Sequence, residues 1–116
     1  MYPNPMFVAL QIAVLMKRSE EKRARLSDKT FRLISQREKL RDKFISDVRG
    51  CLEDLGILMV GLGRGGFAMI WISALEGAPA VTAKKYLTDR RDLATGKKAE
   101  NELWDELQLP LPDEED

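Results

Sequence analysis

Residues 57–72 have the sequence ILMVGLGRGGFAMIWI, in which a glycine-rich run separates two apolar segments. Ile57–Val60 and Phe67–Ile72 are rich in β-branched and aromatic residues, which favour strands. The glycines of Gly61–Gly66 tolerate positive φ angles, so they suit a tight connection between two antiparallel strands. This stretch therefore predicts a β-hairpin with Arg64 at its tip.

The segment before the hairpin predicts an amphipathic helix over Gln36–Leu55. Its apolar residues repeat with helical spacing on one face, and Gly56 follows as a stop signal. Ser35 and Glu38 have the spacing of a capping box, which places the start of the helix directly after Ser35. The apolar face consists of Leu40, Phe44, Val48, Cys51, Leu52 and Leu55.

Further helices are expected on both sides of this region. The segment from Met6 to about Arg23 is apolar nearly all round in its first three turns, which is typical of a helix that is buried or paired with another chain. Ser27 is a suitable N-cap for a short second helix. After the hairpin, helices are expected over residues 81–93 and 97–107, followed by a mobile, Pro-containing acidic tail.

The composition excludes most catalytic and metal chemistry. The 116 residues include no histidine and one cysteine, so a catalytic triad, a zincin motif and an internal disulfide are excluded. The apolar run at residues 6–16 is too short to span a bilayer. We therefore expect a cytoplasmic protein that is not an enzyme, needs no metal or cofactor and does not associate with a membrane.

Gly61–Gly66 also matches the G-x-G-x-x-G pattern of dinucleotide-binding proteins. That pattern has its meaning only where a helix follows, because the helix N-terminus then meets the pyrophosphate. The residues that follow here favour a strand, so we reject a nucleotide site and assign the glycines to a turn.

The zero net charge conceals an uneven distribution along the chain. Residues 1–99 contain nineteen basic and eleven acidic residues, whereas residues 100–116 contain eight acidic residues and no basic one. We therefore expect one domain over residues 1–99 and an acidic helix end with a tail over residues 100–116. A basic body suits a polyanionic partner, and solvated helix faces with a solubilising tail would have the same composition.

The order of these expected elements resembles a winged helix-turn-helix domain. The resemblance covers about Leu26 to Ser73, with Met6–Arg25 as the first helix. It implies an α+β, mostly helical fold with a hairpin wing and additional C-terminal helices. In that family the third helix enters the major groove and the wing contacts the backbone or the minor groove. Gln36–Leu55 would then be the recognition helix and Gly61–Gly66 the wing.

Two functions follow from this interpretation. The first is a small DNA-binding regulator that binds duplex DNA and forms a homodimer through residues 6–16. Its candidate DNA contacts are Arg37, Lys39, Arg41, Lys43, Ser46, Arg49 and Arg64.

The second is a protein-binding module on the same fold, for example a phage or mobile-element inhibitor of a host defence complex, similar to the anti-CRISPR proteins. Its interface candidates are Trp104 and Leu107, because aromatic anchors ringed by charge are common at interfaces. A continuous basic surface would favour DNA. Separate patches, interrupted by Asp42, Asp47 and Glu53, would favour a protein partner.

Overall fold

The computed structural model describes residues 2–108, and these residues divide into two compact units, one that ends at Ala78 and one that begins at Pro79. The division expected at residue 99 is a different one, because it followed the change of net charge along the sequence. The second unit contains three short helices, α5 (Ala83–Tyr86), α6 (Arg90–Thr95) and α7 (Glu100–Leu107). The tail expected over residues 109–116 lies outside the described residues.

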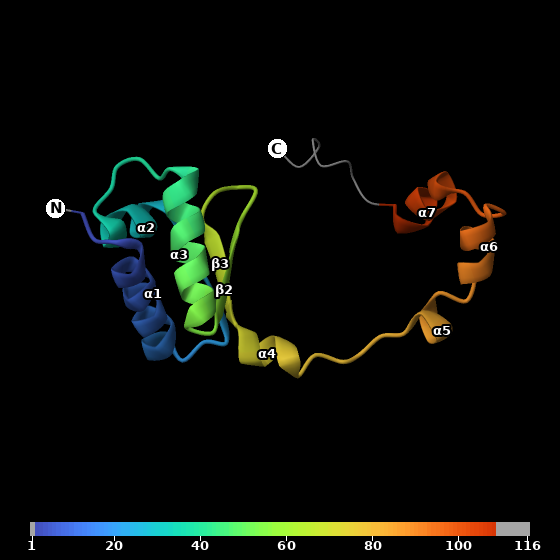
Figure 1. Cartoon of the computed structure of the whole chain (residues 1–116), viewed down its shortest axis with the longest axis horizontal. Helices are drawn as coiled ribbons and strands as arrows, with labels where there is room; N and C mark the ends of the chain where they lie inside the picture. The colour runs from blue at the N-terminus through green and yellow to red at the C-terminus, as the bar shows by residue number, and fades with distance from the viewer. Residues whose placement is uncertain (1, 109–116) are drawn as a thin grey trace. The chain divides into compact units, whose positions relative to one another are not determined.

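The first unit has an α+β fold, as the sequence predicts (Figure 1). Its three-stranded sheet is antiparallel and has the order β1-β3-β2, so β3 pairs with both other strands. The expected hairpin is confirmed as β2 and β3. The elements in chain order are α1 (Pro5–Ser19), β1 (Arg23–Leu26), α2 (Asp28–Ser35), α3 (Asp42–Asp54), β2 (Ile57–Gly61), β3 (Phe67–Trp71) and α4 (Ile72–Glu76).

Side-chain caps fix the starts of the first two helices. The Asn4 side chain accepts a hydrogen bond from the Phe7 backbone N–H at 2.8 Å, and Pro5 begins α1. The Ser27 hydroxyl accepts one from the Thr30 backbone N–H at 3.1 Å, so the prediction of Ser27 as an N-cap is confirmed. Each cap satisfies a backbone donor that has no partner inside its helix.

Strand β1 corrects the prediction of one helix from Met6 to Arg23. Helix α1 ends earlier, where Glu20 adopts a left-handed φ of 59°. The chain then turns back, and β1 pairs with β3 so that Arg23 lies opposite Ile70. Leu26 is buried while Arg25 is exposed, which is the alternation of a strand with one covered face.

The start of α3 corrects the predicted capping box. Ser35 is the last residue of α2, fully buried, and its hydroxyl donates to the Arg32 carbonyl rather than to a following turn. Residues i and i+4 of a helix share a face, so the Ser35 side chain lies on the same buried face of α2 as Phe31. Gln36 then ends α2 with a left-handed φ of 56°, and residues 36–41 form a loop. The third helix is therefore Asp42–Asp54, not Gln36–Leu55.

The core lies between the sheet and helices α1, α2 and α3, which cover one side of it within the first unit (Figure 1). Phe31 is at its centre, with its ring centroid 6.3 Å from that of Phe44 and 4.9 Å from that of Phe67. Helix α1 supplies four of the buried side chains, Val8, Ala9, Ile12 and Met16. The core therefore requires elements from the whole length of the first unit.

The second unit also differs from its predicted elements. The single helix expected over residues 81–93 is two helices, because Leu87 leaves the helical region after α5 and α6 begins only at Arg90. Gly96, with a φ of +82°, ends α6, and α7 begins at Glu100 rather than at Lys97. None of the described residues of this unit is buried.

Candidate nucleic-acid interface

Helix α3 presents a surface of mixed charge. Its apolar side is buried in the core at Phe44, Val48 and Leu52, as the spacing predicts. The helix contains two basic and four acidic residues, because its start at Asp42 leaves part of the basic run outside it. Three of the expected contact residues consequently lie in the preceding loop: Arg37, Lys39 and Arg41.

Lys43 and Ser46 are exposed on the outer side of α3. The Lys43 ammonium lies 3.2 Å from an Asp47 carboxylate oxygen, and the two side chains are 87% and 44% exposed. A surface ion pair of this kind contributes about 0–1 kcal/mol. Lys43 can therefore exchange Asp47 for an incoming anion with little loss of stability.

Arg49 has an internal partner. Its Nε donates a hydrogen bond to the Met59 carbonyl oxygen at 2.9 Å, in a partly buried position. Met59 belongs to β2, an edge strand of the sheet, where backbone groups on the open side lack a strand partner. The contact joins α3 to the sheet, so Arg49 has a structural role, and its expected DNA contact stays a prediction.

The loop between α2 and α3 carries cations of two kinds. Lys39 and Arg41 are exposed, whereas Arg37 is half-buried. The guanidinium carbon of Arg37 lies 3.9 Å from the Phe44 ring centroid and 5.1 Å from that of Tyr2. Sequence reasoning missed this stacking, because it placed Arg37 on the outside of a helix.

The hairpin turn projects one arginine from a constrained backbone. The Leu62 backbone N–H donates to the Gly66 carbonyl and that of Gly65 donates to the Leu62 carbonyl, both at 3.0 Å. The Asp28 carboxylate accepts from the Gly66 backbone N–H at 3.1 Å, which ties the turn to the start of α2. Arg64 is exposed at the tip, as predicted.

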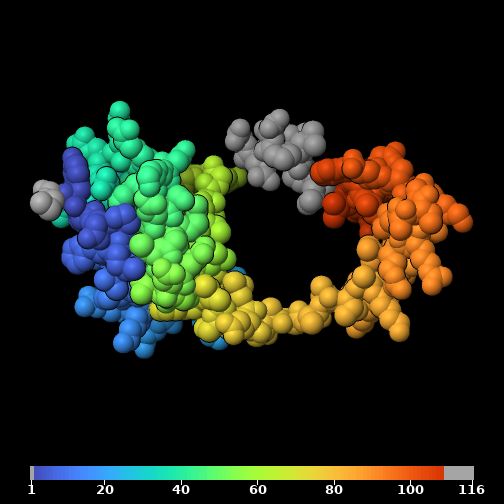
Figure 2. All heavy atoms as spheres, in the orientation of Figure 1, coloured from blue at the N-terminus to red at the C-terminus, as the bar shows by residue number. Residues whose placement is uncertain are grey.

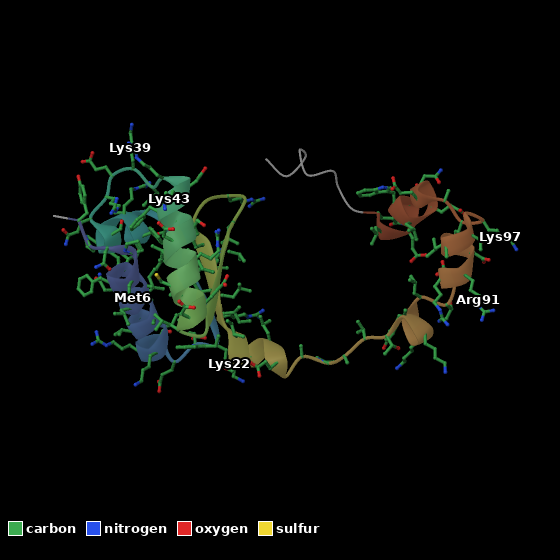
Figure 3. The ribbon with its side chains drawn as sticks, viewed as in Figure 1. Met6, Lys22, Lys39, Lys43, Arg91 and Lys97 are labelled. Atoms are coloured by element: carbon green, nitrogen blue, oxygen red, sulfur yellow. The ribbon has the colours of Figure 1, made fainter. Side chains whose placement is uncertain are left out.

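Several of the expected contact residues gather at one end of the first unit. Figure 3 shows Lys39 and Lys43 at the end of the unit where α3 begins, and the β2–β3 turn extends toward the same end. In the space-filling view that turn forms a protrusion (Figure 2). Lys22 lies at the opposite end (Figure 3). The structure thus brings Lys39, Lys43 and the turn that holds Arg64 to a common end.

A second pair of cations lies on the sheet face that the helices leave open. Arg23 and Arg25 line a hollow there together with Val60, Ala68 and Ile70. Sequence reasoning missed this surface because it assigned Arg23 to a helix. The alternation of Arg-Ala-Arg-Leu over residues 23–26 was the available signal for a strand.

The protein-interface candidates lie on α7 in the second unit. Trp104 and Leu107 are 53% and 57% exposed, on a helix with four acidic residues and no basic one. In the same unit the Asp89 carboxylate accepts a hydrogen bond from the Lys98 ammonium at 2.8 Å. That hydrogen bond lowers the pKa of Asp89 and raises the pKa of Lys98.

No protein-family model, curated protein or solved structure matches this chain. Within residues 2–108, no cluster of three or more His, Cys, Asp or Glu side chains could hold a metal ion. None of the described helices is both long enough and apolar enough to cross a membrane. The functional interpretation therefore depends on the geometry of the residues themselves.

Proposed function

We propose that this protein is a small winged-helix DNA-binding regulator without enzymatic activity. The observation that carries the proposal is the chain order of α1, α2 and α3 followed by the hairpin β2–β3, which is the order that the resemblance implies, while β1 adds a third strand beside β3. In this proposal α3 (Asp42–Asp54) is the recognition helix and Gly61–Gly66 is the wing. A DNA partner and one unpaired cysteine, Cys51, are consistent with a reducing cytoplasm.

The exposed cations at the common end would supply phosphate contacts. Lys39 and Arg41 directly precede α3, Lys43 lies on its first turn, and Arg64 lies on the wing. Ser46 can bond either a base edge or a phosphate, and Asp47, once released by Lys43, can accept from cytosine N4. Four phosphate contacts predict that log K falls with log salt with a slope of about −3 to −4.

The outer side of α1 supports a homodimer in this proposal. Phe7 and Leu10 are 54% and 43% exposed, and together with Val14, Leu15 and Ile34 they line a groove. Exposed apolar patches of this kind are typical of association sites. A second copy packed through α1 would make a two-fold interface, which suits two half-sites on a duplex.

Fluorescence anisotropy with duplex DNA over a salt series tests the DNA proposal in the full chain. Arg64→Ala is expected to weaken the affinity similarly for all DNA sequences and to reduce the slope of log K against log salt by about 1. Arg90→Ala, which removes an exposed arginine from α6, is the matched control and is expected to leave both unchanged. Absence of binding at low salt, or equal effects of the two substitutions, would refute the proposal.

Sedimentation velocity tests the dimer separately. Leu10→Asp is expected to give a monomer, because it places a charge in the apolar groove of α1. Val81→Asp, at an exposed apolar position in the second unit, is expected to leave the assembly unchanged. A wild-type protein that sediments as a monomer at high micromolar concentration would contradict the dimer.

The acidic surface of α3 favours one second candidate, a protein-binding winged-helix module of the anti-CRISPR-like kind. Asp47, Glu53 and Asp54 are exposed on it, and they would repel DNA phosphates but suit a basic protein surface. If duplex DNA does not bind, replacing these three residues by alanine should abolish capture of a host partner. Replacing Glu21, Glu76 and Asp92, which are exposed and lie outside α3 and α7, by alanine is the control with the same change of charge.

A further inference from the structure

The loop between α2 and α3 borders a pocket of about 510 Å³ that is rich in cationic side chains. Three of its six lining residues are cationic, and one is acidic. Five of the six belong to the continuous segment 36–41, and the sixth comes from the N-terminal segment before α1. The lining residues are Tyr2, Gln36, Arg37, Glu38, Lys39 and Arg41.

Arg37 is held in place at this pocket. Its guanidinium stacks on Phe44, a core residue, and the Tyr2 ring centroid lies 5.1 Å from the guanidinium carbon. Its Nε is buried, with no hydrogen-bond partner. A guanidinium that is already fixed by aromatic rings loses little conformational freedom when it binds, and its planar array of donors matches the oxygens of a phosphate.

The cations of the pocket are not neutralised by ion pairs. Among residues 2–108, the ion pairs within 4.0 Å are Lys43–Asp47 and Lys98–Asp89, and neither includes a pocket residue. Glu38 lines the pocket but makes no such pair, so the four charged side chains sum to a positive charge. The positive charge of this loop is therefore available to a ligand.

We propose that this pocket binds a phosphate group, with Arg37 as the fixed donor and with Lys39 and Arg41 as the exposed cations beside it. A phosphate offers several acceptor oxygens and up to two negative charges, whereas a carboxylate offers two oxygens and one charge. The inference deepens the proposed function and rests on it for the source of the phosphate, the DNA backbone. A small phosphorylated molecule has the same chemistry and is distinguished by the experiment.

Two-dimensional ¹H–¹⁵N NMR of the full chain, observing the Arg37 Nε–H group directly, tests the proposal. Inorganic phosphate is expected to shift this resonance and the backbone amides of residues 36–41 in a saturable manner. Acetate at the same ionic strength is expected to shift them much less. The readout is specific, because a purely structural Arg37 would respond equally to both salts.

Two sets of variants assign the effect to the pocket. Arg37→Met keeps an unbranched side chain over Phe44 and is expected to weaken phosphate binding by about tenfold. The double variant Lys39→Met/Arg41→Met changes only exposed positions, so it keeps the test valid if Arg37→Met fails to fold. Lys17→Met/Lys22→Met removes two exposed cations elsewhere, with Lys22 at the far end of the unit (Figure 3), and is expected to bind phosphate normally.

The outcomes separate this inference from the proposed function. If phosphate and acetate give the same shifts, or if both double variants weaken binding equally, the pocket proposal is wrong, even where duplex DNA binds through Arg64. If phosphate and deoxythymidine monophosphate bind at the pocket while duplex DNA neither binds nor displaces them, the pocket stands as a site for a small phosphorylated ligand. The DNA proposal then fails.

Discussion

The two units of this chain hold their secondary structure by different means. In the first, thirteen apolar side chains from three helices and three strands are buried together. In the second, none of the described residues is buried, and the helices contain four, six and eight residues. Isolated helices of this length are marginal in water, because the cost of nucleation is spread over few hydrogen bonds.

Local contacts take the place of a core in the second unit. The Thr82 hydroxyl accepts from the Lys85 backbone N–H at 3.3 Å, and the Glu102 carboxylate accepts from that of Ala99 at 2.8 Å. The Lys98 backbone N–H donates to the Asp92 carbonyl at 3.1 Å, beside the ion pair with Asp89. Substitutions should therefore act cooperatively in the first unit and locally in the second.

Removal of an aromatic side chain from each unit gives the largest expected difference. Phe31→Ala should lower the free energy of unfolding of the first unit by about 3–5 kcal/mol, because it opens a cavity between Phe44 and Phe67. Trp104→Ala removes a side chain that is half exposed and should change the free energy of unfolding of the second unit by less than about 0.5 kcal/mol. Urea unfolding followed through the amide resonances of each unit measures both. A loss of several kcal/mol in Trp104→Ala would show that Trp104 belongs to a cooperative core.

Two glycines with the same backbone angle provide a finer comparison. Gly66 and Gly96 both have a φ of +82°, a region in which an L-residue costs about 1–2 kcal/mol. A Cβ on Gly66 would lie 2.8 Å from the Leu26 carbonyl oxygen, whereas a Cβ on Gly96 meets no atom within 4 Å. Gly66→Ala should therefore destabilise the first unit by more than the backbone effect alone. Gly96→Ala should only reduce the helicity of α6.

Thermal unfolding and far-ultraviolet circular dichroism distinguish these two substitutions. Gly66→Ala should lower the melting temperature and accelerate hydrogen exchange at the amides of residues 62–66, since Asp28 would lose its bond to the turn. Gly96→Ala should leave the melting temperature of the first unit unchanged. Equal melting temperatures for the two variants would mean that the wing backbone can shift away from Leu26 without loss.

The sequence was sufficient for the features of the first unit that depend on local chemistry. The hairpin followed from its glycines, the Ser27 cap from its side chain, and the inner face of α3 from the spacing of Phe44, Val48 and Leu52. In each case the residue type determines the outcome within one turn of helix or one strand. These predictions needed no knowledge of distant contacts.

The missed features depend on contacts between distant residues. Strand β1 has two arginines in four residues, and it forms because β3, more than forty residues later, offers a partner. The pattern at Ser35 and Glu38 fits a capping box, yet burial beside Phe31 places Ser35 at the end of α2 instead. Tertiary packing overrides a local signal at both positions.

The position of one candidate contact residue was predictable from the sequence, whereas the contacts of two others were not. Arg64 lies at the tip of the hairpin as the glycines imply. Arg49 bonds the Met59 carbonyl and Arg37 stacks on Phe44, and both contacts arise from the path of the chain between elements. A basic residue in a sequence indicates a possible phosphate contact, but only its neighbours in space show whether its donors are already used.

The smallest expected effect is the pH response of the second unit, which arises from the hydrogen bond between Lys98 and Asp89. The hydrogen bond from Lys98 lowers the pKa of Asp89. The stabilisation that ionised Asp89 gives the second unit is therefore present at pH values above the ordinary aspartate pKa, and it is lost as the pH falls through the lowered pKa. The same bond raises the pKa of Lys98, whose contribution is present below the ordinary lysine range and is lost as the pH rises through the raised value. The amide shifts around α6 should follow both transitions while those of the buried β3 residues stay constant. Lys98→Met should return the pKa of Asp89 to its ordinary range in a carboxyl ¹³C titration. An Asp89 titration that is the same in Lys98→Met and in the wild type would show that this pair does not order the second unit in solution.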